Sequence, residues 1–286
     1  AARALSLRGY DVALAEAGTQ LGGRVSRERL LPGLSAWGRV ADYRIYQLGQ
    51  RPNVETYFES RLSAQEILEF GFENVCIATG AHWRADGVAR QHVVPIPAEG
   101  ALPVFTPDDI MAGKCPEGEV VLFDDDHYYM GGVVAELLAK RGCKVTFVTP
   151  SAYVSDWTLN TLEQASIHRR LVECGVKIVL NTGIARLTPS GVVTECVYTD
   201  ATAEIGCDAA VLVASRRSDD ALYHALIARK GEWAEAGIRS VKLIGDACAT
   251  GPIAWATYAG HRYARELDQP DIGDALPFRR EVTQLA

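Results

Sequence analysis

Residues 119–148 carry the pattern that most narrows the fold of this chain. Val120–Phe123 is a short apolar run typical of a buried strand, and Gly131–Lys140 places apolar side chains at helical spacing. Gly142 then stands where a helix ends, and Lys144–Val148 forms a second apolar run. Strand, helix and strand in this order predict a complete βαβ unit, and therefore an α/β fold.

The loop of this unit departs from a phosphate-binding turn. It reads Asp124-Asp125-Asp126-His127-Tyr128-Tyr129-Met130-Gly131 where the glycines of a dinucleotide site belong. Three carboxylates would repel a pyrophosphate, and Tyr128 would block the close backbone approach that glycine permits. The second strand ends in Thr149-Pro150, without an acid for a ribose or an arginine for a 2′-phosphate. We therefore favour a lost nucleotide site over an intact one.

A second strand and helix occupy Val241–Leu267. The apolar run stops at Gly245-Asp246, and Pro252 opens a helical pattern with small residues along one face. Asp246 thus stands at the carboxyl end of a strand, where open α/β sheets bind ligands, and the helix N-terminus offers free N–H groups to an anion or a flavin carbonyl. An ordinary strand–helix unit with a turn aspartate explains this stretch equally well.

The chain opens with a segment typical of the second half of a helix, Ala1–Arg8. Asp11–Ala15 follows as a buried strand that ends at Glu16. In dinucleotide-binding units an acid at this position accepts the ribose hydroxyls, after a glycine turn and a first strand. Both would fall before residue 1, so we expect a fragment of a longer polypeptide.

Two glycine-containing turns complete the candidate site. Gly22-Gly23-Arg24 suits close backbone approach to a pyrophosphate together with a paired cation, although a loop with a solvated arginine is an equal alternative. Ala78-Thr79-Gly80 follows the strand Val75–Ala78 and would let backbone contact a ligand at the edge of the sheet.

The order of these segments predicts two Rossmann-like dinucleotide-binding domains, the second inserted in the first. Irregular, proline-rich sequence at 93–107 and 113–118 marks the crossover. Residues 1–114 and 219–286 form the predicted FAD- or ADP-binding domain, which lacks its first strand and glycine turn. Residues 115–218 form an NAD(P)-binding-like domain with a degenerate nucleotide site.

Composition excludes several classes of protein. Apolar residues make up 48% and charged residues 23% of the chain, as in ordinary globular proteins. A net charge of −7 argues against nucleic acid or an anionic membrane as a partner. No apolar run approaches the roughly 20 residues of a membrane span. We expect a cytoplasmic protein.

The cysteines favour reduced thiols. They are seven, an odd number, scattered without a C-x-x-C pair, and the histidines show no metal-binding spacing. We therefore expect no disulfide, metal or iron–sulfur cluster within these residues. The seven are Cys76, Cys115, Cys143, Cys174, Cys196, Cys207 and Cys248.

Taken together, the motifs resemble a known family. Glu16, Leu21–Arg24, Ala78–Gly80, the inserted βαβ unit and Ile244–Ala247 look like the two-dinucleotide-fold flavoproteins of the disulfide reductase type. More narrowly, the chain resembles the C-terminal half of the trimethylamine dehydrogenase, histamine dehydrogenase and 2,4-dienoyl-CoA reductase family, which are old yellow enzyme-like flavoproteins. The resemblance covers nearly the whole chain.

The resemblance implies a division of labour. In that family an N-terminal barrel carries FMN and substrate, and a cysteine cluster binds a [4Fe–4S] centre, so no catalytic residue is expected in this chain. In the reductase branch the two C-terminal domains bind FAD and NADPH. In the amine dehydrogenase branch the second site is degenerate, the first holds ADP, and electrons leave to an electron-transferring flavoprotein. The Asp124–Tyr128 loop matches the second branch.

By resemblance, Glu16 would bind the adenosine ribose, Gly22–Arg24 would line the pyrophosphate, and Gly245-Asp246 would lie beside the ribityl chain. The expected function is the nucleotide-binding part, with FAD or ADP, of a homodimeric oxidoreductase acting on small methylated amines. One alternative is an FAD relay from NAD(P)H, as in dienoyl-CoA reductase. Another is a non-catalytic ADP- or FAD-binding module that docks an electron acceptor.

Overall fold

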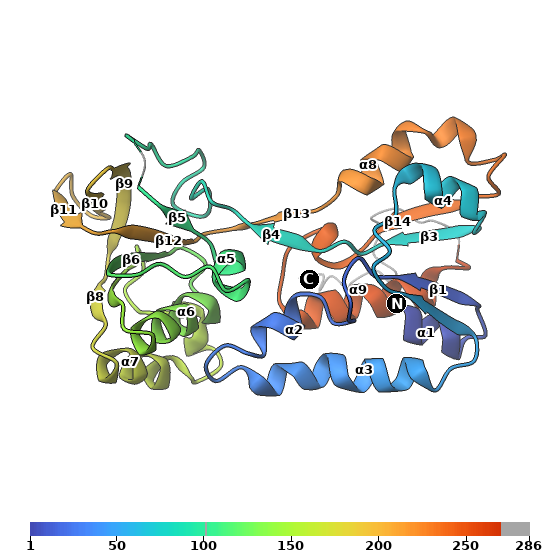
Figure 1. The fold of residues 1–286 in the computed structure, drawn as a ribbon, viewed down its shortest axis with the longest axis horizontal. Helices are drawn as coiled ribbons and strands as arrows, with labels where there is room; N and C mark the ends of the chain where they lie inside the picture. The colour runs from blue at the N-terminus through green and yellow to red at the C-terminus, as the bar shows by residue number, and fades with distance from the viewer. Residues whose placement is uncertain (101, 270–286) are drawn as a thin grey trace, which may run out of the picture.

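A five-stranded parallel sheet forms the largest part of the fold. The computed structural model describes residues 1–100 and 102–269 (Figure 1). The strand order is β5-β12-β6-β7-β8, and every neighbouring pair runs parallel. These strands are β5 (Val104–Phe105), β12 (Ala209–Val213), β6 (Glu119–Asp124), β7 (Lys144–Val148) and β8 (Lys177–Val179).

Both faces of this sheet are covered, because its side chains alternate between two cores. Val120 and Leu122 of β6 pack in one core together with three helices. Val121 and Phe123 pack in a second core with an antiparallel sheet of three strands. The helices are α5 (Pro107–Met111), α6 (Tyr129–Lys140) and α7 (Gln164–Glu173), and the antiparallel strands are β9 (Thr182–Thr188), β10 (Gly191–Cys196) and β11 (Thr202–Gly206). The predicted βαβ unit is thus confirmed as β6, α6 and β7.

The rest of the chain is built on short strand pairs. β1 (Val12–Ala15) pairs with β2 (Val54–Tyr57), and β3 (Asn74–Ile77) pairs with β14 (Ser240–Leu243), both in parallel. Around them lie α1 (Ala2–Leu7), α2 (Arg24–Glu28), α3 (Arg39–Gly49), α4 (Ala64–Phe70), α8 (Ala221–Ala228) and α9 (Ile253–Glu266). Short 3₁₀ turns are η1 (Ser35–Gly38), η2 (Asp156–Leu159), η3 (Lys230–Glu232) and η4 (Gly245–Ala247).

The prediction of two Rossmann-like dinucleotide-binding domains is wrong. Such a domain needs one continuous hydrogen-bonded parallel sheet. Within the described residues, β1–β2 and β3–β14 remain separate two-stranded sheets, and a single parallel sheet of greater width is present. Apolar runs correctly indicated β1, β3, β6, β7 and β14, but they could not indicate how the strands pair. The predicted domain boundaries stay predictions.

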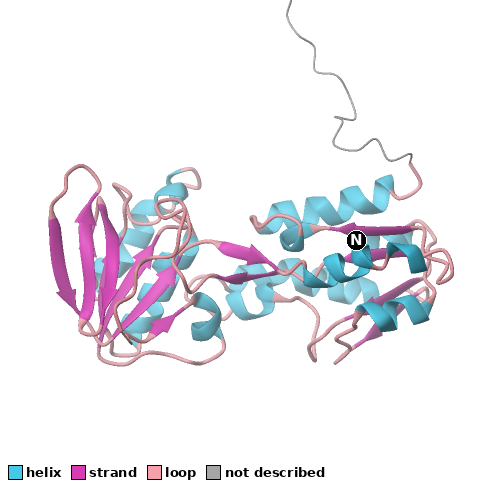
Figure 2. Ribbon diagram, turned by 90° about the horizontal axis from the view of Figure 1, so that it is seen from above, coloured by secondary structure: helices cyan, strands magenta, loops and turns pink. Residues whose placement is uncertain are grey.

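Two antiparallel strands connect the two parts of the molecule. β4 (Ala81–Trp83) pairs with β13 (Arg216–Ser218), and this ribbon runs between the five-stranded sheet and the short strand pairs (Figures 1 and 2). β13 therefore falls within a run of charged residues, Arg216–Asp220. Within the described residues, no helix combines the length and apolar character that a membrane span requires.

The segment after α2 anchors the N-terminal part to the core of the five-stranded sheet. Leu31 and Leu34 are buried in the same cluster as Val133 and Val134 of α6. Trp37 makes an edge-to-face contact with Tyr129, with ring centroids 5.2 Å apart. Residues of the first forty therefore complete a core that is formed largely by β6, α6 and β7.

Leu34→Ala should accordingly destabilise the protein, because Leu34 is 3% exposed in this shared core. We expect a loss of about 2–5 kcal/mol in the free energy of unfolding, measured by denaturant titration. Leu30→Ala is the matched control: Leu30 lies four residues earlier and is 80% exposed, so its removal should change stability by less than about 0.5 kcal/mol. Equal losses in the two variants would contradict the anchoring role.

Candidate functional site

The loop between β6 and α6 is buried and hydrogen-bonded within the protein. Asp124 and Asp125 are fully buried, and His127 nearly so. The N–H groups of Asp125 and Asp126 both donate to the carbonyl of Val213, at 2.9 and 3.1 Å. The N–H of His127 donates to Oδ1 of Asp124 at 3.1 Å. The amides that would hold a phosphate in a glycine-rich turn are therefore already bonded within the protein.

Asp124 also fills the space above the first turn of α6. A Cβ added at Gly131 would lie 2.4 Å from Cγ of Asp124, so this glycine allows the carboxyl group to pack against the helix. Both carboxylate oxygens of Asp125 have hydrogen-bond partners. Oδ1 contacts Nε2 of His127 at 3.0 Å, and Oδ2 accepts from the N–H of Gln91 at 2.8 Å. This geometry supports the predicted loss of a nucleotide site at this turn.

Burial raises the proton affinity of this acidic loop. Desolvation raises the pKa of Asp124 to about 7 and that of Asp126 to about 6. Burial by itself lowers the pKa of His127, but its hydrogen bond to Asp125 and the charges of Asp124 and Asp125 outweigh burial, and the net pKa is raised. Arg90 and Arg24 face Asp126 and favour its charged form.

These shifts predict that stability falls as the pH rises from about 4 to about 7. In that range the folded loop retains protons that the unfolded chain has released, so deprotonation favours unfolding. The raised pKa of His127 acts in the same direction. Asp124→Asn removes one titrating group, and the decrease in unfolding free energy across this range should shrink by a few kcal/mol, on the order expected for a shift of this size.

Thermal and denaturant unfolding at a series of pH values would measure this slope. Asp200→Asn, at an exposed position in the β10–β11 turn, is the control and should keep the parent profile. An unchanged slope in Asp124→Asn would show that Asp124 does not bind a proton in the folded protein.

The structure brings some of the predicted cofactor-binding residues together. Arg24, the first residue of α2, places Nε 2.8 Å from Oε1 of Glu28 and Nη1 3.4 Å from Oδ2 of Asp246. Nη1 of Arg216 lies 2.6 Å from the same Asp246 oxygen. All four side chains are largely buried. The structure thus joins Gly22–Arg24 to Gly245-Asp246, which are more than 220 residues apart in sequence.

The predicted glycines adopt the left-handed conformations that a close backbone approach requires. Gly22, Gly23, Gly80 and Gly245 have φ of 117°, 52°, 87° and 60°. A Cβ at Gly22 would lie 2.2 Å from Oγ of Ser26, whereas a Cβ at Gly23 or Gly80 would meet no atom within 4 Å. Backbone at Gly23 and Gly80 is therefore open to a ligand.

The remaining predicted residues flank this region. The hydroxyl of Thr79, which follows Ala78, donates to the carbonyl of Asp219, and the N–H of Asp219 donates to the carbonyl of Gly80 at 2.9 Å. Ser218 donates from its hydroxyl to the carbonyl of Asp246 at 2.7 Å, which ties this turn to η4.

Glu16 ends β1 as predicted. Its carboxylate accepts the N–H of Gly18 at 2.7 Å, and its own N–H donates to the carbonyl of Tyr57 at 2.8 Å. Across the described part of the chain, no hydrogen bond or ion pair links Glu16 to the other predicted site residues. The Glu16 assignment stays a prediction.

Two residues of this network were not anticipated. Arg216 donates to the carbonyl of Gly251 at 3.0 Å as well as binding Asp246, and Glu28 is buried beside Arg24. Burial raises the pKa of Glu28, although the charge of Arg24 opposes this. The alternation of Arg216 and Ser218 on one face of a strand was the available signal, but its run of charged residues favoured a loop.

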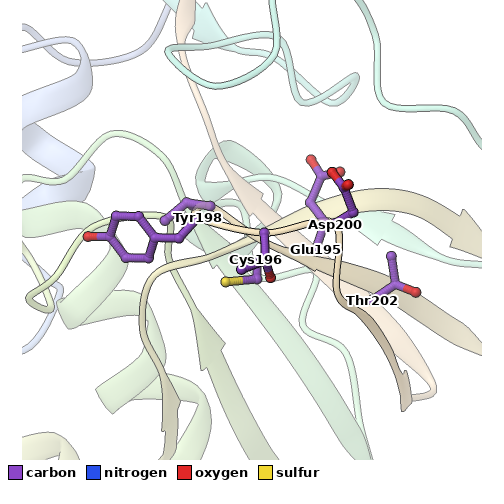
Figure 3. A pocket seen from close by; sticks show the side chains of 7 residues that line it. Glu195, Cys196, Tyr198, Asp200 and Thr202 are labelled. Atoms are coloured by element: carbon purple, nitrogen blue, oxygen red, sulfur yellow. The ribbon is translucent and has the colours of Figure 1, made fainter.

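A surface pocket lies apart from these residues. It occupies about 430 Å³ at the β10–β11 turn and is lined by Glu195–Asp200 and Thr202 (Figure 3). The N–H of Tyr198 and the side chain of Thr199 hydrogen-bond to the sulfur and lower the pKa of Cys196. None of the predicted site residues lines this pocket.

Comparison with known proteins places part of the chain in a described domain class. Residues 105–205, which contain β6, β7 and β8 of the five-stranded sheet, match the OYE-like second alpha/beta domain. The chain is 36% identical to dimethylamine dehydrogenase from Hyphomicrobium sp. (strain x) over 306 aligned residues, which is 98% of this chain and 41% of that protein.

Two solved structures are similar over nearly the whole chain. Histamine dehydrogenase from Rhizobium sp. 4-9 is 68% identical, with a TM-score of 0.97 over 100% of this chain and 44% of its own. The 6-hydroxypseudooxynicotine amine oxidase from Pseudomonas geniculata N1 is 46% identical, with a TM-score of 0.90 over 94% of this chain and 40% of its own. The chain therefore spans less than half the length of these relatives.

These matches complete the correction of the fold class. The disulfide reductase RclA from Escherichia coli aligns at 17% identity with a TM-score of only 0.53. The fold is instead the OYE-like α/β arrangement found in the corresponding part of histamine dehydrogenase. The resemblance to the trimethylamine dehydrogenase and histamine dehydrogenase family is confirmed, and this chain is a homologue of part of the dimethylamine and histamine dehydrogenases.

Proposed function

We propose that this protein is an oxidoreductase that oxidises small amines. The observation that carries the proposal is the similarity to three proteins named for amine oxidation, over 94% to 100% of this chain. Their named substrates are a methylated amine, histamine and 6-hydroxypseudooxynicotine. We infer that the substrate is a primary or secondary amine of low molecular mass.

Within that enzyme, this chain would hold an adenine nucleotide, either ADP or FAD. The open backbone at Gly23 and Gly80 and the left-handed turn at Gly245 fit the close approach of a pyrophosphate or ribityl chain. Arg24 would supply positive charge beside the pyrophosphate, oriented by Glu28 and Asp246. Glu16 at the end of β1 would accept the ribose hydroxyls.

The FMN and [4Fe–4S] cluster implied by the resemblance would be bound by residues outside this chain. When bound, they supply two-electron acceptance from the amine and one-electron transfer to an acceptor. This chain's own contribution is to bind, orient and exclude water around its nucleotide. The resemblance also implies an electron-transferring flavoprotein as the acceptor and a homodimeric assembly. Both stay proposals.

The loop between β6 and α6 discriminates between the alternatives. An FAD relay from NAD(P)H needs a second nucleotide site, and the bonded amides of Asp125–His127 disfavour one there. A non-catalytic docking module would bind ADP or FAD without any role in electron transfer. We favour the amine dehydrogenase over both.

Substrate-dependent reduction of an artificial electron acceptor would test the activity. Dimethylamine and histamine, offered to the purified full-length polypeptide that includes the flavin-binding part, should reduce the acceptor, whereas NADPH should not. The nucleotides released by denaturing the same preparation should include ADP without stoichiometric FAD. NADPH-dependent bleaching of bound FAD would instead support the relay, and a nucleotide without amine turnover would support the docking module.

Gly23→Ser tests the nucleotide site itself. A side chain at this open backbone position would occupy the space proposed for the pyrophosphate, and ADP affinity measured by calorimetry should fall at least about tenfold. Gly33→Ser is the matched control, because Gly33 also has a positive φ with no atom within 4 Å of an added Cβ. Equal affinities in the two variants would place the nucleotide elsewhere.

A further inference from the structure

Two cysteines lie together at the amino edge of the five-stranded sheet. Cys115 belongs to the segment that leads into β6, and Cys143 directly precedes β7. β6 and β7 pair with Glu119 opposite Lys144, and the N–H of Lys144 donates to the carbonyl of Gly118 at 2.9 Å. Strand pairing therefore brings together two thiols that are separated in sequence by the whole of β6 and α6.

The side chains of both cysteines lie in this corner. Sγ of Cys143 donates to the carbonyl of Pro116 at 3.3 Å, directly beside Cys115. Nη1 of Arg141 donates to Sγ of Cys115. Both cysteines pack against the core on the helix-covered face of the sheet, and both are free thiols.

Cys207 lies at the same edge of the sheet but is not part of this pair. It lies near the start of β12, but it packs against the core on the opposite face. The sheet therefore separates Cys207 from the other two thiols. Only Cys115 and Cys143, among these three, share one side.

We propose that Cys115 and Cys143 are a redox-modification site that closes to a disulfide between the segments leading into β6 and β7. The oxidant is a low-molecular-weight disulfide of the glutathione class. The proposal is independent of the amine-oxidising function, because it rests on residues outside the nucleotide site.

The chemistry proceeds by two exchanges. The Cys115 thiolate attacks one sulfur of oxidised glutathione, so that a Cys115–glutathione bond forms and one glutathione thiolate leaves. That thiolate takes the proton of Cys143, whose sulfur then attacks Cys115 and expels the second glutathione. The second glutathione thiolate takes the proton that Cys115 released, so the two cysteines lose two electrons and one oxidised glutathione becomes two reduced molecules.

The surroundings of the two sulfurs indicate which cysteine attacks first. The Arg141 guanidinium contacts the sulfur of Cys115, and this segment is exposed at Lys114, so the oxidant can reach it. Burial, together with the nearby Cys115 and Glu117, raises the pKa of Cys143. Cys143 therefore acts second, once the mixed disulfide lies beside it.

Peptide mapping after oxidation tests the pairing. The purified protein is treated with oxidised glutathione, its remaining thiols are alkylated, and the digest is analysed by mass spectrometry. We expect a Cys115–Cys143 linked peptide that dithiothreitol removes, and a thermal midpoint that rises by several degrees with the linkage. Cys207→Ser should leave the linked peptide unchanged.

Two further variants separate the steps. Cys143→Ser should accumulate the glutathione adduct on Cys115, and Arg141→Gln in that background should slow its formation several-fold. An adduct on Cys115 of the parent protein that never converts to the linked peptide would overturn the pairing. Linkage of Cys115 to another cysteine, or absence of any modification at Cys115, would overturn it as well. Thermal unfolding of the reduced variants checks that each is folded.

Discussion

The structure depends on burial of both faces of the parallel sheet. β6 and β12 are almost free of solvent contact, and successive side chains of each strand enter different cores. A parallel sheet is stable only when covered in this way. The helices on one side and the antiparallel sheet on the other are therefore requirements of the same apolar pattern. The N-terminal segment contributes as well, because Leu31 and Leu34 close the helix-side core.

This burial sets the character of the acidic loop. A carboxyl group removed from water is costly unless hydrogen bonds or a proton compensate it. Asp125 is compensated by Gln91 and His127, whereas Oδ2 of Asp124 is buried without a partner. A proton on Asp124 reduces this cost, which agrees with the direction of its pKa. The turn is stable because the protein's own groups occupy the positions that a phosphate would take.

The second polar cluster, unlike the acidic loop, is arranged in a way that suits a bound ligand. Arg24, Glu28, Arg216 and Asp246 balance two positive with two negative charges, but among the described residues Nε and Nη1 of Arg24 and Oε2 of Glu28 are buried without a hydrogen-bond partner. The adjoining glycines leave backbone exposed. Charge that is already oriented and backbone that is open together suit a ligand bound by its phosphates and sugar. These features support a nucleotide at this cluster in preference to the acidic loop.

The sequence by itself determined the local elements. Apolar periodicity indicated the βαβ unit, and the Ser63-to-Glu66 capping box and the left-handed Gly71 mark the ends of α4. The acidic residues of the 124–128 loop predicted that this turn does not suit a pyrophosphate. Such features depend on residues within a few positions of one another, so their physical causes are visible in the sequence.

Only the tertiary structure decided how these elements combine. An apolar run specifies a strand but not its hydrogen-bonding neighbour, so the separate β1–β2 and β3–β14 pairs overturned the predicted pair of Rossmann-like domains. The same holds for Arg216, which only the fold brings to Asp246. Pairing and burial arise from contacts between distant segments, and no local pattern encodes them.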